Sequence, residues 1–139
     1  MSVGKEAAVH ATTFNSVLKK MVAFGVNRSL ALRAHRLRPK FNLLVNESPL
    51  MVMEIVGPHL LKHSAPIKEG DLQYFIDYDY TKEYEESDTE EDRKTFENIM
   101  TIISATYKNC KAEDHDFLAD LADELLISYC QYLKCLRAK

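Results

Sequence analysis

The strongest constraint on the fold is the spacing of apolar residues in three long stretches, which follows the period of an α-helix. In each stretch they recur at intervals of three and four residues, which places them on one side of a helix. The first set is Phe14, Val17, Leu18, Met21 and Val22. The second is Phe96, Ile99, Met100, Ile103 and Tyr107, and the third is Leu118, Leu121, Ala122, Leu125, Tyr129 and Tyr132. Because every long periodic stretch has this period, the sequence predicts an all-α fold.

Shorter helices are expected between the first two of these stretches. One runs from Leu30 to Leu44 with a kink or restart near Pro39, because proline disrupts the helical hydrogen bonding. Another begins at Ser48–Pro49 and is interrupted at Gly57–Pro58, and a third is capped by Asp71. The 139 residues, 46% of them hydrophobic, are enough for one core. We therefore predict a single-domain bundle of five to six helices over residues 1–139.

The last two helices are expected to form a helical hairpin over residues 88–137. The capping-box pattern Ser87-Asp88-Thr89-Glu90 predicts the start of the first helix, and the short link Asn109–Ala112 predicts that the second packs against it antiparallel. Residues 77–92, with nine acids and one lysine, precede this hairpin. Such a density of like charge repels itself, so we predict an acidic loop there.

Charge is distributed unevenly along the chain. Residues 1–40 hold eight Lys and Arg and one acid, Glu6, whereas residues 41–139 hold ten Lys and Arg and twenty acids. The basic N-terminal helices of residues 1–46 therefore precede an acidic remainder. The composition of residues 7–46 is also that of an organelle transit peptide, but the apolar spacing is that of a packed helix.

The densest basic stretch supplies the candidate contact residues, Arg28, Arg33, Arg36, Arg38 and Lys40. Such side chains could neutralise the phosphates of a nucleic acid. They could equally meet an acidic surface of the same chain, of another subunit or of a partner protein. We favour a protein contact, because the rest of the chain is acidic and no aromatic side chains for base stacking are interleaved with the basic ones. Nucleic acid remains the alternative.

Three short patterns invite a catalytic or metal-binding interpretation. Asp77-Tyr78-Asp79-Tyr80-Thr81 spells the DxDxT of haloacid-dehalogenase-type phosphatases, but no alternation of strands and helices surrounds it. Read as a calcium loop, the same run lacks the glycine at position six. His59 and His63 are spaced to share a zinc ion, with His115 and Cys110 as conceivable third ligands, yet we favour an ordinary, partly exposed histidine pair. We predict no catalytic residue, no metal site and no cofactor.

The remaining composition bears on location. No apolar run reaches the roughly 18 residues of a membrane span. The three cysteines, Cys110, Cys130 and Cys135, are an odd number, which favours free buried thiols in a reducing compartment. We therefore expect an intracellular protein that does not bind membranes.

A further set of residues carries a resemblance to a known group of proteins. The order Phe41, Asn46-Glu47-Ser48-Pro49, Ile55, His63, Ile67, Gly70-Asp71, Tyr74-Phe75 and Asp79-Tyr80 resembles small all-helical proteins of nucleocytoplasmic large DNA viruses of algae and amoebae. The likeness extends to Tyr132-Leu133 and covers about two-thirds of the chain. This chain departs from the group in having no tryptophan, with Tyr107 as the nearest substitute in the penultimate helix, and the basic segment Arg28–Lys40 does not carry over.

The resemblance implies a fold and an origin but no catalytic residue, because the group has no established biochemical activity. Taken with the charge distribution, it predicts a non-catalytic interaction or structural protein of a large DNA virus that acts through protein–protein contacts or self-association. Its location would be the host cytoplasm or nucleus, or the virion. The alternative is a nucleic-acid-associated protein that uses residues 28–40.

Overall fold

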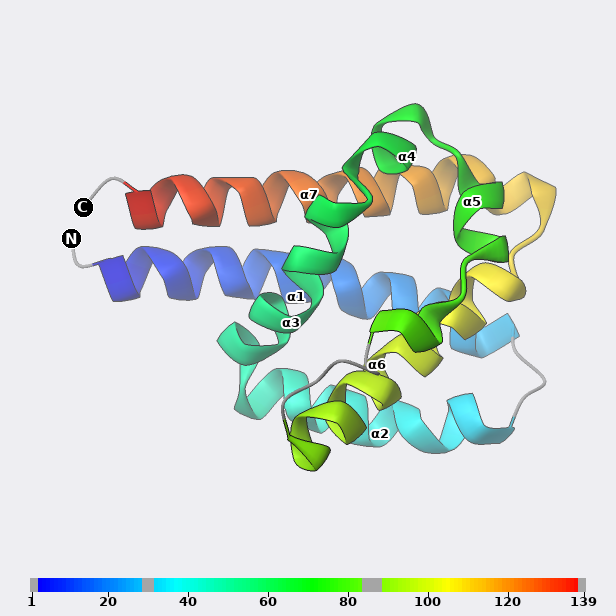
Figure 1. Cartoon of the computed structure of the whole chain (residues 1–139), viewed down its shortest axis with the longest axis horizontal. Helices are drawn as coiled ribbons and strands as arrows, with labels where there is room; N and C mark the ends of the chain where they lie inside the picture. Colours follow the sequence, from blue (N-terminus) through cyan, green and yellow to red (C-terminus); the bar gives the residue numbers. More distant parts are fainter. Residues whose placement is uncertain (1–2, 29–31, 84–88, 138–139) are drawn as a thin grey trace.

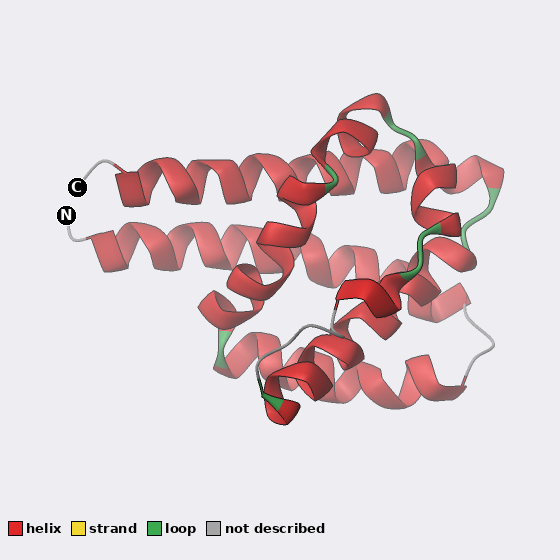
Figure 2. Ribbon diagram, viewed as in Figure 1, coloured by secondary structure: helices red, strands yellow, loops and turns green. Residues whose placement is uncertain are grey.

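The computed structural model describes residues 3–28, 32–83 and 89–137 of the chain, and the regular structure in these residues is entirely helical (Figure 2). Its elements are α1 (Val3–Arg28), α2 (Leu32–Glu47), α3 (Pro49–Lys62), α4 (Ser64–Glu69), α5 (Leu72–Asp77), η1 (Tyr80–Glu83), α6 (Glu90–Lys108), η2 (Ala112–Asp114) and α7 (His115–Arg137). The prediction of an all-α, single-domain fold is confirmed. The described residues form seven α-helices rather than five or six, because a turn at His63 separates α4 from α3.

The longest two helices, α1 and α7, lie side by side and antiparallel, so that α1 begins where α7 ends (Figure 1). Between them lie side chains predicted for the core, including Phe14 and Leu18 of α1 and Leu118 and Leu125 of α7, each at most 1% exposed. α1 also packs against α2, α3 and α6. It is therefore the central helix of the fold.

The predicted packing of α6 against α7 is wrong. Among the described residues α6 packs on α1, α2, α5 and η1, whereas α7 packs on α1, α3 and α4. The buried face of α6 is wider than the expected set of residues, because it includes Ile102 (1% exposed) and Thr106 (0%). Thr106 lies where a Cβ on Gly25 would sit, so glycine allows α6 to approach the backbone of α1 closely. The short link after α6 thus leads to α7, and both helices pack on α1.

Two prolines lie inside helices that continue past them. α2 contains Pro39 and α3 contains Pro58, so the expected interruption at Gly57–Pro58 is wrong. A proline removes one helical hydrogen bond, but the residues around Pro58 are held by burial of Val56, Gly57 and Leu60. Pro49 takes the predicted first position of α3, although the side chain of Ser48 makes no capping hydrogen bond.

The segment after α4 is more ordered than a solvated loop. Gly70 ends α4 with a left-handed φ of 68°, and the Asp71 side chain accepts a hydrogen bond from the Tyr74 amide, as predicted for a cap. Tyr80, within the predicted acidic loop, is 6% exposed, and its hydroxyl donates to the Phe75 carbonyl (3.0 Å). The loop prediction is therefore wrong at Tyr80. The capping box at residues 87–90 lies partly outside the described residues.

The close approach of α6 and α1 predicts the effect of a minimal substitution. Alanine normally favours a helix by about 1 kcal/mol over glycine, but a Cβ at residue 25 would meet the backbone of Thr106. We expect Gly25→Ala to lower the free energy of unfolding by about 1–3 kcal/mol, as overpacking does, measured by urea denaturation followed by circular dichroism. An unchanged or raised midpoint would contradict the close packing of these helices.

Candidate interaction surface

The basic stretch predicted from the sequence is divided between two helices. Arg28 ends α1 and Arg33 opens α2, and the side chains of both lie outside the described residues. Arg36 and Lys40 are exposed, and both lie one helical turn apart on α2. Arg38 is half-buried, and its Nη1 donates to Asn27 Oδ1 of α1 (2.8 Å). Arg38 thus helps to join α1 and α2, whereas Arg36 and Lys40 face solvent.

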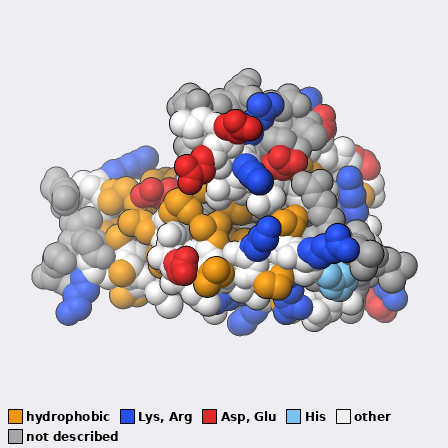
Figure 3. Space-filling model, turned by 90° about the horizontal axis from the view of Figure 1, so that it is seen from below, with side chains coloured by type: hydrophobic (Ala, Val, Ile, Leu, Met, Phe, Trp, Pro, Cys, Tyr) orange, Lys and Arg blue, Asp and Glu red, His pale blue; other side chains and the backbone are white. Residues whose placement is uncertain are grey.

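An exposed apolar residue continues the line of these two cations. Leu43 is 57% exposed and follows Lys40 by three residues, so that Arg36, Lys40 and Leu43 lie at i, i+4 and i+7 on one side of α2. We call these three residues the basic stripe. The molecule seen from the side of α2 shows Lys and Arg side chains next to hydrophobic ones (Figure 3). The basic stripe is therefore mixed in character, neither purely cationic nor purely apolar.

A groove runs beside the basic stripe, between α2 and α6. Its volume is about 190 Å³, and its walls are mostly apolar. It is lined by Leu37, Lys40, Phe41, Leu44, Thr95, Asn98, Ile99 and Ile102. Lys40 belongs to both features, so that a cation stands at the edge of the apolar groove. Mixed surfaces of this kind, with a depressed apolar part and a charged rim, are typical of protein contacts.

The uneven charge distribution allowed the basic segment to pair with acids of the same chain. The basic stripe makes no such pair among the described residues. Among the residues that the structure describes, Arg36 and Lys40 have no ion pair or side-chain hydrogen bond. Glu47 is the one acid on α2, at its C-terminal end. The cations of the stripe are therefore available to a partner. Leu43 was not predicted from the sequence, although a signal for it was its place outside the apolar line of Leu37, Phe41 and Leu44, which is buried or partly buried.

The two histidines of the zinc hypothesis are buried rather than partly exposed. His59 and His63 are each 5% exposed, and their ring centroids are 4.8 Å apart. A hydrogen bond joins Tyr74 Oη to His63 Nδ1 (2.6 Å), and the ring of Tyr78 lies 4.6 Å from that of His63. The prediction of an ordinary, partly exposed pair is wrong because α5 and η1 cover the pair with aromatic rings.

Among the residues that the structure describes, these histidines meet no third metal ligand. Within residues 3–28, 32–83 and 89–137, no three His, Cys, Asp or Glu side chains come together as a metal site would require. Cys110 and His115, the conceivable third ligands, do not join them. Asp77 is the last residue of the helix α5 and Asp79 follows it, and both are exposed, whereas the DxDxT chemistry uses an aspartate at the end of a strand.

The three cysteines are free thiols, and two of them have low reactivity. Cys135 is buried, and its thiol donates to Glu6 Oε2 (3.0 Å), which raises the pKa of that thiol because a carboxylate disfavours the thiolate. Burial likewise raises the pKa of the half-buried Cys110. A raised pKa leaves less thiolate at neutral pH, and the thiolate is the nucleophile. Neither thiol is therefore activated for catalysis.

Comparison with known proteins identifies no relative. No family model, no curated protein and no solved structure matches the chain. None of the helices in the described part of the chain has the length and apolar character needed to cross a membrane.

The histidine cluster yields a prediction that separates a structural role from a metal site. Tyr74→Phe removes a hydrogen bond to a buried imidazole, so we expect the free energy of unfolding to fall by about 1–2 kcal/mol in urea denaturation. Because no third ligand joins the two imidazoles within the described part of the chain, one equivalent of Zn²⁺ should leave Tm of the native protein unchanged. A zinc-induced rise in Tm that disappears in His63→Ala would show that the cluster is a metal site.

Proposed function

We propose that this chain is a non-catalytic interaction or structural protein of a large DNA virus, and that it binds another protein through the basic stripe of α2. The observation that carries the proposal is Leu43. A large apolar side chain left 57% exposed, one helical turn after two exposed cations, gains nothing from a phosphate backbone, but it is buried when a protein surface covers it. The groove beside it provides further apolar surface for the same partner.

The positive charge of the basic stripe favours a partner with an acidic surface. Arg36 and Lys40 lie one turn apart, so an acidic helix or strand that covers Leu43 would bring carboxylates within reach of both. Complementary charge of this kind sets the orientation and the rate of association more than the affinity. Apolar burial around Leu43 supplies the affinity, and the cations select the partner.

The viral origin in the proposal rests on the resemblance alone, and several of the residues that carry the resemblance have structural roles here. Gly70 ends α4, Asp71 caps α5, and Tyr74 bonds to the buried His63. Phe75 is in the core and accepts the hydrogen bond of Tyr80 through its carbonyl. A pattern made of such positions specifies a fold and not a reaction, in keeping with a non-catalytic protein.

Photo-crosslinking tests the proposed contact in the cells that make the protein. A photoreactive phenylalanine analogue in place of Leu43 should give protein adducts that resist nuclease, because this side chain lies in the contact. The matched control is Leu61 on α3, which is also an exposed leucine, at 40%, and should give few adducts. Equal yields at the two positions, or no protein adduct at Leu43, would contradict the proposal.

The nucleic-acid alternative is tested by fluorescence anisotropy of labelled duplex DNA. We expect no submicromolar binding by the native protein at physiological salt, because most of the chain is acidic and would repel a polyanion. If tight binding is found, and Arg36→Gln with Lys40→Gln lowers the log–log salt slope by about one unit per lost contact, the stripe binds phosphates. Nuclease-sensitive adducts at Leu43 would point the same way.

A further inference from the structure

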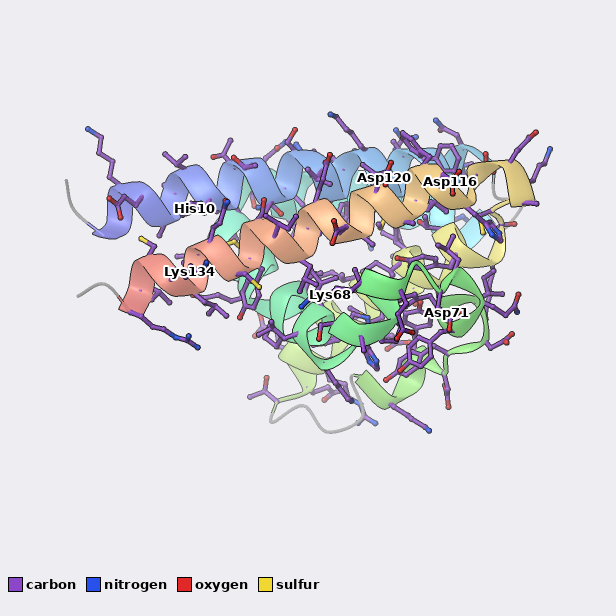
Figure 4. All side chains as sticks on the ribbon, turned by 90° about the horizontal axis from the view of Figure 1, so that it is seen from above. His10, Lys68, Asp71, Asp116, Asp120 and Lys134 are labelled. Carbon is purple, nitrogen blue, oxygen red and sulfur yellow. The ribbon has the colours of Figure 1, made fainter. Side chains whose placement is uncertain are left out.

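A second exposed stripe lies on α7 and has the opposite charge. Asp120 and Glu124 are exposed one turn apart, and Ile127, three residues further on, is 50% exposed. We call these three residues the acidic stripe. They point away from the buried face of α7, which contains Leu118, Leu125 and Tyr129. Figure 4 shows Asp116 and Asp120 on the first half of α7, with Lys134 near its end.

The two stripes have the same spacing and the same order along the chain. Arg36, Lys40 and Leu43 lie at i, i+4 and i+7, and so do Asp120, Glu124 and Ile127. Each set extends about 10.5 Å along its helix, at 1.5 Å per residue. If α2 of one copy lies parallel to α7 of another, Arg36 faces Asp120, Lys40 faces Glu124, and Leu43 covers Ile127. The antiparallel arrangement would place a charge opposite an apolar residue at both ends.

Residues around the stripes agree with this register. The positions that continue each stripe at i+11 are Glu47 on α2 and Gln131 on α7, both exposed and a pair without like charge. From His115 to Leu133, α7 contains four acids and neither Lys nor Arg, so no Lys or Arg of this part of the helix opposes the basic stripe. In the described part of the chain, Asp120 and Glu124 have no ion pair or side-chain hydrogen bond, as is true of Arg36 and Lys40.

We propose that the partner of the basic stripe is the acidic stripe of a second copy of this chain. This inference rests on the proposed function and names its partner. α2 and α7 lie on opposite edges of the molecule, with α1 between them (Figure 1). The same two surfaces therefore do not close a symmetric dimer, and each copy joins one neighbour through α2 and another through α7. Such a head-to-tail contact forms rings or open chains.

The contact is small and depends on charge, so it should be weak and sensitive to salt. Ion pairs between exposed side chains contribute little to affinity, and salt weakens them further. In sedimentation velocity at low ionic strength, we expect the average mass of the native protein to rise with protein concentration, and added salt to reverse the rise. A native protein that stays monomeric at millimolar concentration and low salt would overturn the proposal.

Charge reversal provides the decisive test. R36E/K40E gives a chain with two acidic stripes, and D120K/E124K gives a chain with two basic ones. Each variant alone should associate at least about tenfold more weakly than the native protein, since attraction becomes repulsion. An equimolar mixture of the two should regain association, because every contact is again between opposite charges. No recovery in the mixture would refute the pairing.

The matched control and a register test use the same measurement. K82E/K94E changes the net charge as much as R36E/K40E does, but at exposed lysines outside both stripes, and should associate like the native protein. An equal loss in the control would show a net-charge effect and overturn the proposal. In single-variant mixtures, R36E should be rescued better by D120K than by E124K, because Arg36 faces Asp120.

The outcomes also separate this inference from the proposed function. Adducts at Leu43 that contain only other proteins, together with a monomeric native chain, would leave the proposed function standing and remove the second copy as partner. Adducts that contain a second copy of this chain support both. DNA-dependent association, lost after nuclease treatment, would overturn both.

Discussion

The fold depends on the burial of α1 on several sides at once. A helix at the surface of a protein buries only one of its sides. α1 instead packs against α2, α3, α6 and α7, and its residues Phe14 and Leu18 are fully buried among them. This is possible only if the neighbours approach closely. Gly25 provides the space for α6 at Thr106, and Gly57 of α3 provides space for the ring of Tyr129 on α7. The positions of the outer helices, and with them the two charged stripes, follow from this central helix.

The sequence was sufficient to predict the helices because each long helix has a regular apolar face. Every residue predicted for the inner face of α7 is buried, from Leu118 to Tyr132. It was not sufficient to predict which helices pack together. Ile102 and Thr106 widen the buried face of α6, and a residue as polar as threonine gives no apolar signal. A close approach to glycine is likewise invisible until the partner is known.

The candidate surface was predicted in part. The excess of cations identified α2, since charge density needs no knowledge of packing, but it could not separate Arg38, which bonds to Asn27, from Arg36 and Lys40, which face solvent. The aromatic cover of His59 and His63 was missed because part of it lies within the acidic run 77–92, which indicated a solvated loop: Tyr78 follows α5, and Tyr80 begins η1. Leu43 and Ile127 lie outside the apolar faces of their helices. This position in the sequence is the signal that indicates exposed apolar residues.

The antiparallel pairing of the first and last long helices has a consequence for synthesis. Glu6 and Cys135 are joined by a hydrogen bond across 129 positions of the chain, so the most extensive packing of α1 waits for the final helix to be translated. Contacts between such distant parts of a chain slow folding, because a long loop must close before they form. During translation the apolar face of α1 has only α2, α3 and α6 to cover it. The nascent chain therefore exposes Phe14 and its neighbours longest, and these residues are where a chaperone would bind.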